Sequence, residues 1–548
     1  MDIKKKLITL VVGCYLLSAG GMIMPANAAD DMEDLTLTDF PTQYSHAVIS
    51  KGHYVNWAGV SSVSQFADEK GNFCFAVDEG ERVSVYKTDQ GSISKKISID
   101  NPYDSFGAAA CGADGSLYMV WGYNNDTDDR SVETIIVSKY TPEGVFVASA
   151  GGNGSEGMPY YYGDGFYTKT PFSGGNCDVA INGDLLMVNY ARGMYSGHQA
   201  NTLFAVDTAT MTIKAGMTTY NSHSFDQRVT AYTKTGGFLL ESQGDCFPRS
   251  FATTVTNSER NLGQMNTFNF WVEKDAYSDY DMYKLNATRA RLGNILETSH
   301  GAALVAASAR SLSEAAKTEP YDVFVQVFDP VGSANDVDSY VTSGVRSGLA
   351  GNNGDTEVTD YGVYWLTDLA ESGKTVEEVQ AVSIENDGIA VLYELYQGSR
   401  YDSTWCMVLN GDGSVAIEAT SLGAVRLNVD EDPVYAQGTV QWVSNGSDSD
   451  KLVLHALHIV TPKSDVFGNA NELEWTYSKG SVMIVGPFSA EEPVIAACYA
   501  ADGALLDVKI MTQSGDEVPM LDNTDVMKLF WIDSMWKPKC IPAEISAN

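Results

Sequence analysis

Basic residues are scarce in this chain, and their scarcity narrows the classes of partner it can bind. The 548 residues include 35 Lys and Arg against 71 Asp and Glu, a formal net charge of −36. So negative a field repels the phosphates of nucleic acids and anionic lipids, and it favours solubility. Binding to nucleic acid is therefore not expected. Most of the acidic side chains should form a solvated exterior, with an affinity for cations or cationic partners as the alternative.

Paired cysteines are also lacking. The sequence contains eight cysteines and no Cys-x-x-Cys pair, so a structural zinc site is not predicted. Most lie in apolar, strand-like segments, where a thiol packs as a small hydrophobic group. After residue 28 an odd number remains, which excludes complete internal pairing: Cys74, Cys111, Cys177, Cys246, Cys406, Cys498 and Cys540.

Long apolar runs are missing except at the start of the chain. Lysines at residues 4–6 precede a mostly apolar stretch, and residues 25–28 end in a small-x-small cleavage pattern. This order predicts a signal peptide over residues 1–28. Residues 11–14 resemble a lipobox, so a lipid on Cys14 is the alternative. No later run reaches the roughly 18 apolar residues of a membrane-spanning helix. We therefore expect a secreted protein, released or held at the surface by non-covalent contacts.

Helical periodicity is scarce as well, with residues 312–317 and 375–381 as the candidates. Instead, a polar turn with Gly or Asp followed by an apolar strand recurs, as at residues 114–121 and 387–393. With intervening hairpins the unit repeats at roughly 50–60 residues. Repeated hairpins expose sheet edges unless a ring closes on itself. We therefore predict an all-β fold in which residues 29–465 form a β-propeller of about seven blades. An array of β-sandwiches is the alternative.

The sequence changes character after residue 465. Alternating strands and polar turns over residues 466–548 predict a small immunoglobulin-like β-sandwich. Its ending resembles an accessory domain of many secreted Firmicutes proteins, including glycoside hydrolases. That domain carries a Trp-Asp-Ser triplet near a Lys-Pro, whereas here Ile532 separates Trp531 from Asp533. The resemblance implies an accessory module without a chemistry of its own.

Three polar stretches stand out from the strand-rich sequence, at residues 190–199, 223–228 and 244–249. Each flanks an apolar run, so their side chains are expected on loops, where binding and catalysis concentrate. Arginine clamps carboxylates, and histidine or tyrosine transfers protons. Packing of strand ends through buried hydrogen bonds is the alternative. We predict no catalytic or metal-binding residue; the predicted ligand-binding residues are Arg192, Tyr195, His198, Gln199, His223, Asp226, Arg228, Asp245 and Arg249.

The same stretches carry a resemblance to a known group of proteins. In order, the chain shows Gly-x-x-Asn, Thr-Pro-Phe-x-x-Gly, Met-Tyr with His-Gln-Ala-Asn, Ser-His-Ser-Phe-x-Gln, Gly-Asp-x-x-Pro-Arg and Trp-Leu-Thr-Asp motifs. The series resembles secreted or surface β-propeller-like proteins of clostridial and related Firmicutes, a group without an assigned activity. That group tends to have His-Glu where Arg192 and Gly193 stand, and Asp-His where Ser242 and Gln243 stand. If those groups were catalytic, this chain would be impaired.

Signatures of common enzymes are absent. Residues 124–129 offer oxygen ligands for calcium but lack the Gly and distal Glu of an EF-hand loop, so no cofactor is predicted. There is no Gly-x-Ser-x-Gly elbow, phosphate loop or sialidase-type Asp-box. We predict a propeller that binds a glycan or another extracellular polymer, without demonstrated catalysis. The alternatives are a polysaccharide lyase or glycoside hydrolase acting on an acidic glycan, and an architectural surface protein.

Overall fold

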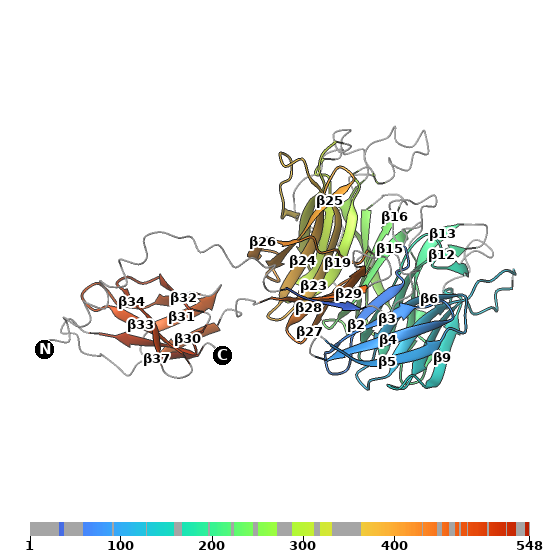
Figure 1. The fold of residues 1–548 in the computed structure, drawn as a ribbon, viewed down its shortest axis with the longest axis horizontal. Helices are drawn as coiled ribbons and strands as arrows, with labels where there is room; N and C mark the ends of the chain where they lie inside the picture. Colours follow the sequence, from blue (N-terminus) through green and yellow to red (C-terminus); the bar gives the residue numbers. More distant parts are fainter. Residues whose placement is uncertain are drawn as a thin grey trace. The chain divides into compact units, whose positions relative to one another are not determined.

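The computed structural model shows a chain built mainly from antiparallel β-strands (Figure 1). Its described residues fall into two compact units, residues 32–459 and residues 466–546. The structure describes residues 32–37, 59–89, 92–127, 129–157, 167–194, 198–220, 224–244, 250–270, 286, 288–311, 318–330, 363–429, 431–445, 452–459, 466–470, 473–478, 481–500, 504–521, 523–532 and 543–546.

Seven antiparallel sheets make up the described part of the larger unit, and the first three follow one another along the chain. A short 3₁₀ helix, Ala215–Met217, follows the third sheet. The strands of these sheets are β2 (Val63–Ala67), β3 (Phe73–Asp78), β4 (Arg82–Asp89) and β5 (Ser92–Asp100); β6 (Ser105–Cys111), β7 (Leu117–Gly122), β8 (Ile135–Tyr140) and β9 (Phe146–Gly152); and β10 (Thr168–Pro171), β11 (Cys177–Asn182), β12 (Leu185–Met194), β13 (Gln199–Asp207) and β14 (Thr212–Ile213).

The next three sheets repeat this order, each with four strands joined to their neighbours in sequence. They contain β15 (Ser224–Tyr232), β16 (Gly237–Gly244), β17 (Ser250–Thr256) and β18 (Asn261–Asn269); β19 (Arg291–Thr298), β20 (Gly301–Ser308), β21 (Asp322–Phe328) and β22 (Tyr364–Trp365); and β23 (Thr375–Ile384), β24 (Gly388–Gln397), β25 (Arg400–Leu409) and β26 (Val415–Gly423).

The last sheet joins the two ends of this unit. Its strands β27 (Val434–Ala436), β28 (Thr439–Asn445) and β29 (Leu452–His458) end the unit, and β1 (Met32–Leu37) begins it. β1 pairs antiparallel with β29. One strand from each sheet, the inner strand, contacts the inner strands of its two neighbours in a closed series: β2 with β6, β6 with β11, β11 with β15, β15 with β19, β19 with β23, β23 with β27 and β27 with β2. A closed ring of such sheets is a β-propeller, so the predicted fold is confirmed at that level.

The third sheet departs from the four-strand pattern, because its inner strand is split. β10 and β11 both pair with β12. Between them Phe172 has a left-handed backbone, with φ of 58°. Its ring lies where a Cβ on Gly107 or Gly122 would collide with it, so both positions need glycine. Beyond this break the chain enters β11, which carries Asp178 to the inner side of the ring.

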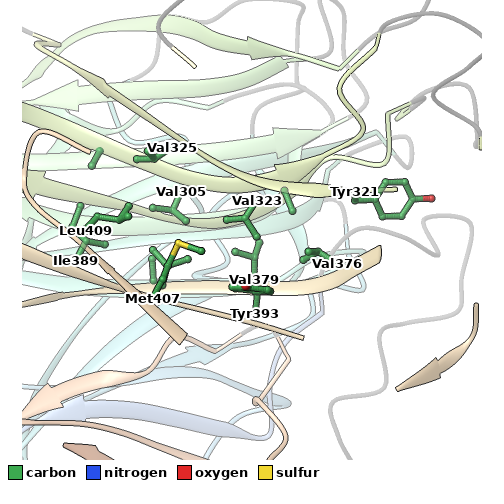
Figure 2. Close-up of a cluster of buried hydrophobic side chains, with 14 of the residues drawn as sticks. Val305, Tyr321, Val323, Val325, Val376, Val379, Ile389, Tyr393, Met407 and Leu409 are labelled. Atoms are coloured by element: carbon green, nitrogen blue, oxygen red, sulfur yellow. The ribbon is translucent and has the colours of Figure 1, made fainter. Parts of the chain in front are cut away.

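Neighbouring sheets pack through apolar side chains. Figure 2 shows side chains of β20 and β21 facing those of β23, β24 and β25. Burial of one valine or leucine side chain contributes about 1.5–3 kcal/mol, so each such interface holds two sheets together firmly. The labelled residues are Val305, Tyr321, Val323, Val325, Val376, Val379, Ile389, Tyr393, Met407 and Leu409.

Residues 375–381, a helix candidate in the sequence, lie in strand β23. Val376 and Val379 are three residues apart, which is helical spacing. A β-bulge between Val376 and Glu378 adds one residue to the strand, so both valines face the same core. The helical prediction was wrong because the bulge replaces the strand period of two by three at this point. The other candidate, residues 312–317, lies outside the described residues.

The smaller unit consists of two four-stranded antiparallel sheets around one core that includes Val482, Met527 and Trp531. Its immunoglobulin-like character stays a prediction. Nowhere in the described part of the chain is a helix long and apolar enough to span a membrane. The strands are β30 (Val466–Ala470), β31 (Leu473–Ser478), β32 (Ser481–Val485) and β35 (Asp516–Pro519) in one sheet, and β34 (Leu505–Met511), β33 (Val494–Tyr499), β36 (Val526–Trp531) and β37 (Ala543–Ser546) in the other.

Candidate functional site

A cavity of about 210 Å³ lies on the inner side of the propeller ring. It is bordered by the first strands of three sheets, β2, β6 and β11, and by the segment that precedes β27. We call it the central cavity. The described lining residues are 64–67, 108–111, 177–181 and Glu431.

Two carboxylates line the central cavity, Asp178 of β11 and Glu431. Asp178 accepts hydrogen bonds from the backbone N–H groups of Val179 and Val229, both at 2.7 Å. Glu431 accepts one from the backbone N–H of Gln65. Both side chains belong to half-buried residues. Backbone groups therefore hold the carboxylates in place while each still borders the cavity.

The surroundings of this pair favour the protonated forms. Burial raises the pKa of Asp178 to about 6, although the charge of Arg228 and two backbone N–H groups act in the opposite direction. Burial also raises the pKa of Glu431 well above its usual range, and the charge of Asp178 raises it further. Two interacting carboxyl groups release their protons in linked steps, so the pair retains a proton at mildly acidic pH.

Arg228 of β15 forms ion pairs with two nearby carboxylates, those of Asp226 and Asp432. Its Nε lies 3.1 Å from Asp432 Oδ2 and donates to the carbonyl oxygen of Gly293 at 3.2 Å. One terminal nitrogen donates to Asp226 Oδ1 at 2.7 Å and to the carbonyl oxygen of Gln227 at 2.8 Å. Asp432 precedes β27, whereas Gly293 lies in β19, so one guanidinium joins three sheets of the ring.

The segment that carries Glu431 and Asp432 is held in place by contacts of Arg426, a few residues earlier in the chain. Arg426 donates from Nε to Glu394 Oε1 at 2.9 Å, and its guanidinium lies 4.3 Å from the ring centre of Tyr401. The indole nitrogen of Trp442 donates to the carbonyl oxygen of Arg426 at 2.9 Å. These contacts fix the path of the segment, which supports the positions of its two carboxylates.

An amide network joins the third sheet to the fourth. The side-chain nitrogen of Asn201 donates to Asn189 Oδ1 at 2.8 Å, to Gln227 Oε1 at 3.1 Å and to Ser242 Oγ at 3.0 Å. All four residues are buried. These buried hydrogen bonds connect the two sheets, and Gln227, which belongs to the stretch 223–228, takes part in this packing.

The structure separates the predicted ligand-binding residues. Asp226 and Arg228 are buried together beside the central cavity. Arg192 is fully buried and donates to Gly154 O and Thr168 Oγ1, both at 3.3 Å, and burial lowers the pKa of its guanidinium. His198 is exposed and Gln199 is half-buried. The remaining four lie outside the described residues: Tyr195, His223, Asp245 and Arg249.

Sequence reasoning missed Asp178, Glu431 and Asp432. The available signal was a charged residue inside an apolar strand, as in Cys177–Asn182, and a run of three acidic residues directly before Pro433. Either pattern is common on a solvated surface, so neither one is specific. Their approach to Arg228 depends on closure of the ring.

In the described part of the chain, no group of three or more His, Cys, Asp and Glu side chains is arranged to hold an ion. In the loop considered for calcium, Asn125 Oδ1 accepts from the backbone N–H of Thr127 at 3.0 Å, and Asp129 Oδ1 accepts from that of Ser131 at 2.9 Å. These oxygens stabilise turns of the loop itself.

Glu241 of β16 is a second unusual carboxyl group, and it is fully buried. Thr253 Oγ1 donates to its Oε2 at 2.5 Å, whereas its Oε1 has no hydrogen-bond partner. Burial raises the pKa of Glu241 to about 8, against the effect of the Thr253 hydroxyl. Folding therefore takes up a proton at neutral pH, since the unfolded chain has released it above about pH 4.5.

We expect Glu241→Gln to make the stability of the protein less dependent on pH. In the parent protein the free energy of unfolding should fall from about pH 5 to about pH 8, because Glu241 is protonated in the folded protein and ionised in the unfolded chain over this range. Above about pH 8 Glu241 is ionised in both states, so the fall ends. The substitution should remove about 2–4 kcal/mol of this fall. Chemical denaturation across this range measures it, with the exposed Glu259→Gln as the matched control. Parallel pH profiles for parent and Glu241→Gln would contradict the assignment.

Comparison with known proteins identifies no relative by sequence: no family model and no curated protein matches the chain. Among solved structures, the Trypanosoma rangeli sialidase in complex with the inhibitor DANA is 8% identical, over 93% of this chain and 88% of that chain, with a TM-score of 0.36. The Dos1 propeller is 9% identical over 73% and 94%, with a TM-score of 0.34. An α-L-arabinanase of Penicillium chrysogenum complexed with arabinobiose is 7% identical over 68% and 92%, with a TM-score of 0.28. Scores this low support no statement about function, so the propeller assignment rests on strand topology.

Proposed function

We propose that the chain is a secreted or surface-associated propeller that binds a glycan or another extracellular polymer, and that the central cavity receives part of this ligand. The observation that carries the proposal is the pair Asp178 and Glu431, two carboxylates that border a cavity on the inner side of the ring. Ligand sites commonly combine a concave surface with a few placed polar groups. Because the cavity is small, we infer that it takes a single ring-sized unit of the ligand.

We further infer that each of the seven sheets of the larger unit is one blade and that the smaller unit is an immunoglobulin-like accessory module. The four-stranded sheets and the closed series of contacts between their inner strands support seven blades. Two sheets around one core support the sandwich. In this proposal the propeller contacts the ligand and the smaller unit contributes no chemistry.

Hydrolysis of a glycoside is the second candidate, and a specific observation favours it. Burial raises the pKa of both Asp178 and Glu431, and the charge of Asp178 raises the pKa of Glu431 further. Glycoside hydrolases generally use two carboxyl groups, one protonated and one ionised, to protonate the leaving oxygen and to activate water or attack the sugar. Release of reducing ends from a bound glycan would separate hydrolysis from simple binding.

A glycan array tests the binding proposal. The mature chain should bind at least one class of glycan, and Asp178→Asn should weaken that binding about tenfold, equivalent to about 1.4 kcal/mol, because a hydrogen-bond acceptor at the cavity is lost. Glu418→Gln, which changes an exposed carboxylate on β26, serves as the control. Binding that is equal in all three proteins would place the ligand elsewhere, and no binding across the array would favour an architectural role.

A further inference from the structure

The central cavity combines an apolar lining with a few acidic and neutral polar side chains. Its described lining contains two carboxylates, Asp178 and Glu431, and no Lys or Arg. Ser64 and Gln65 supply further polar groups at the same cavity. Gln65 is engaged in the ring itself, since its side-chain nitrogen donates to Asp432 O at 2.9 Å. A ligand in this cavity therefore meets carboxylate oxygens that can accept hydrogen bonds from it.

Two arginines of the neighbouring inner strands β15 and β19 are already engaged with other groups. Arg228 donates to Asp226, to Gly293 O and to Gln227 O, and it forms an ion pair with Asp432. Its residue is 3% exposed, so its guanidinium is committed to the ring. Arg291 of β19 lies 3.0 Å from Glu377 Oε2. Neither arginine is therefore placed to neutralise an anionic ligand.

We propose that the central cavity selects a ligand unit that carries a protonated amine, as an amino sugar does, and rejects a unit that carries a carboxylate. This inference rests on the proposed function and adds its ligand class. A protonated amine donates up to three hydrogen bonds and pairs with carboxylates, and each oxygen of Asp178 and Glu431 has a second lone pair that can accept from it. A uronate in the same place would meet like charges, and Arg228, the cation whose charge reaches both carboxylates, is already paired with Asp226 and Asp432.

The charge of the molecule and the chemistry of its described residues favour an organic cation. A net charge of −36 attracts cations and raises their concentration near the ring. A metal ion is disfavoured, because the described residues contain no three-member group suited to one. The sequence also left open an acidic glycan as the substrate. Such a glycan is disfavoured, because its carboxylates would be repelled by the carboxylates of the cavity.

Binding of an amine should release protons from the cavity. Burial raises the pKa of Asp178 to about 6, and a cation beside it favours the ionised form, so the proton held by the pair leaves on binding. Proton release is a readout that a purely structural role of these carboxylates would not produce. The titratable and charged groups around Asp178 and Glu431 are Cys177, Asp226, Arg228 and Asp432.

Calorimetric titration of the mature chain at about pH 6 tests the inference, with four probes: a glucosamine tetramer, the N-acetylated tetramer, a galacturonate tetramer and a tri-lysine peptide. We expect the glucosamine tetramer to bind at least about tenfold more tightly than the other three. Its binding should weaken about tenfold in Asp178→Asn and in Glu431→Gln, and remain unchanged in Glu418→Gln. Repeating the titration in buffers of different ionisation enthalpy should show proton release.

The possible outcomes separate this inference from the proposed function. If the N-acetylated tetramer binds equally well and Asp178→Asn still weakens it, the cavity binds a glycan but the amine selectivity is wrong. If tri-lysine binds as tightly as the glucosamine tetramer, the cavity is a general cation site and the glycan class is wrong. If binding is unchanged in both cavity variants, or if no probe binds, the amine inference is overturned. Thermal melting of each variant shows whether a loss of binding reflects unfolding.

Discussion

Arg228→Met should lower the free energy of unfolding by about 3–5 kcal/mol, because removing one partner of a buried ion pair leaves the other charges uncompensated. Arg228 is almost fully buried and contacts groups from three sheets. Asp226 and Asp432 would both lose their cation, and burial already disfavours the ionised form of Asp226. Denaturant unfolding followed by tryptophan fluorescence measures the effect.

The control for this prediction is a salt bridge at the surface. Arg82 is 3.9 Å from Glu79, with half of its side chain exposed, so Arg82→Met should change stability by less than about 1 kcal/mol. A triple variant with Arg228→Met, Asp226→Asn and Asp432→Asn should recover part of the lost stability, since it also removes the charges of the two carboxylates that pair with Arg228. An Arg228→Met protein as stable as the parent would show that the central ion pairs do not hold the sheets together.

Deleting residues 29–38 should destabilise the larger unit by on the order of 5 kcal/mol, since six residues lose backbone pairing worth about 1 kcal/mol each. These residues include β1, which pairs over its whole length with β29. Without it, the last sheet loses its outer strand and β29 becomes an exposed edge open to aggregation. Thermal unfolding and light scattering of the shortened chain measure both consequences.

A synthetic peptide provides the matched control. Residues 30–39 added in trans should restore the melting temperature of the shortened chain as the peptide concentration rises. The same peptide with Leu35→Pro should restore less, because proline removes a donor and disturbs the paired strand. If the shortened chain melts like the full chain, ring closure does not depend on β1.

Local patterns in the sequence predicted the recurring unit of a polar turn followed by an apolar strand. At residues 114–116, Asp114 Oδ1 accepts from the Ser116 N–H at 3.0 Å and Gly115 has φ of 78°, so the turn follows from its own residue types. The apolar run after it becomes β7, buried throughout. Strand β23 shows the limit of this reasoning, since the bulge at Val376 and Glu378 produces a helical spacing that only pairing with β24 corrects.

The candidate site was predicted in part. Asp226 and Arg228 drew attention because they are charged residues next to an apolar run, and both lie beside the central cavity. Arg192 drew attention for the same reason, yet it is buried against Gly154 and Thr168. Sequence reveals that a polar group lies at the end of a strand. It does not reveal whether that end points to the centre of the ring or into the packing between sheets.

The sequence by itself determined the all-β character, the repeated strand-and-turn unit and the acidic charge, because these depend on the chemistry of neighbouring residues. Only the tertiary structure decided which distant groups meet. Asp432 and Arg228 are about two hundred positions apart, and Gln65 reaches Glu431 across an even longer stretch of chain, since closing a ring brings its first and last sheets together. A cavity bordered by Asp178 and Glu431 exists for the same reason.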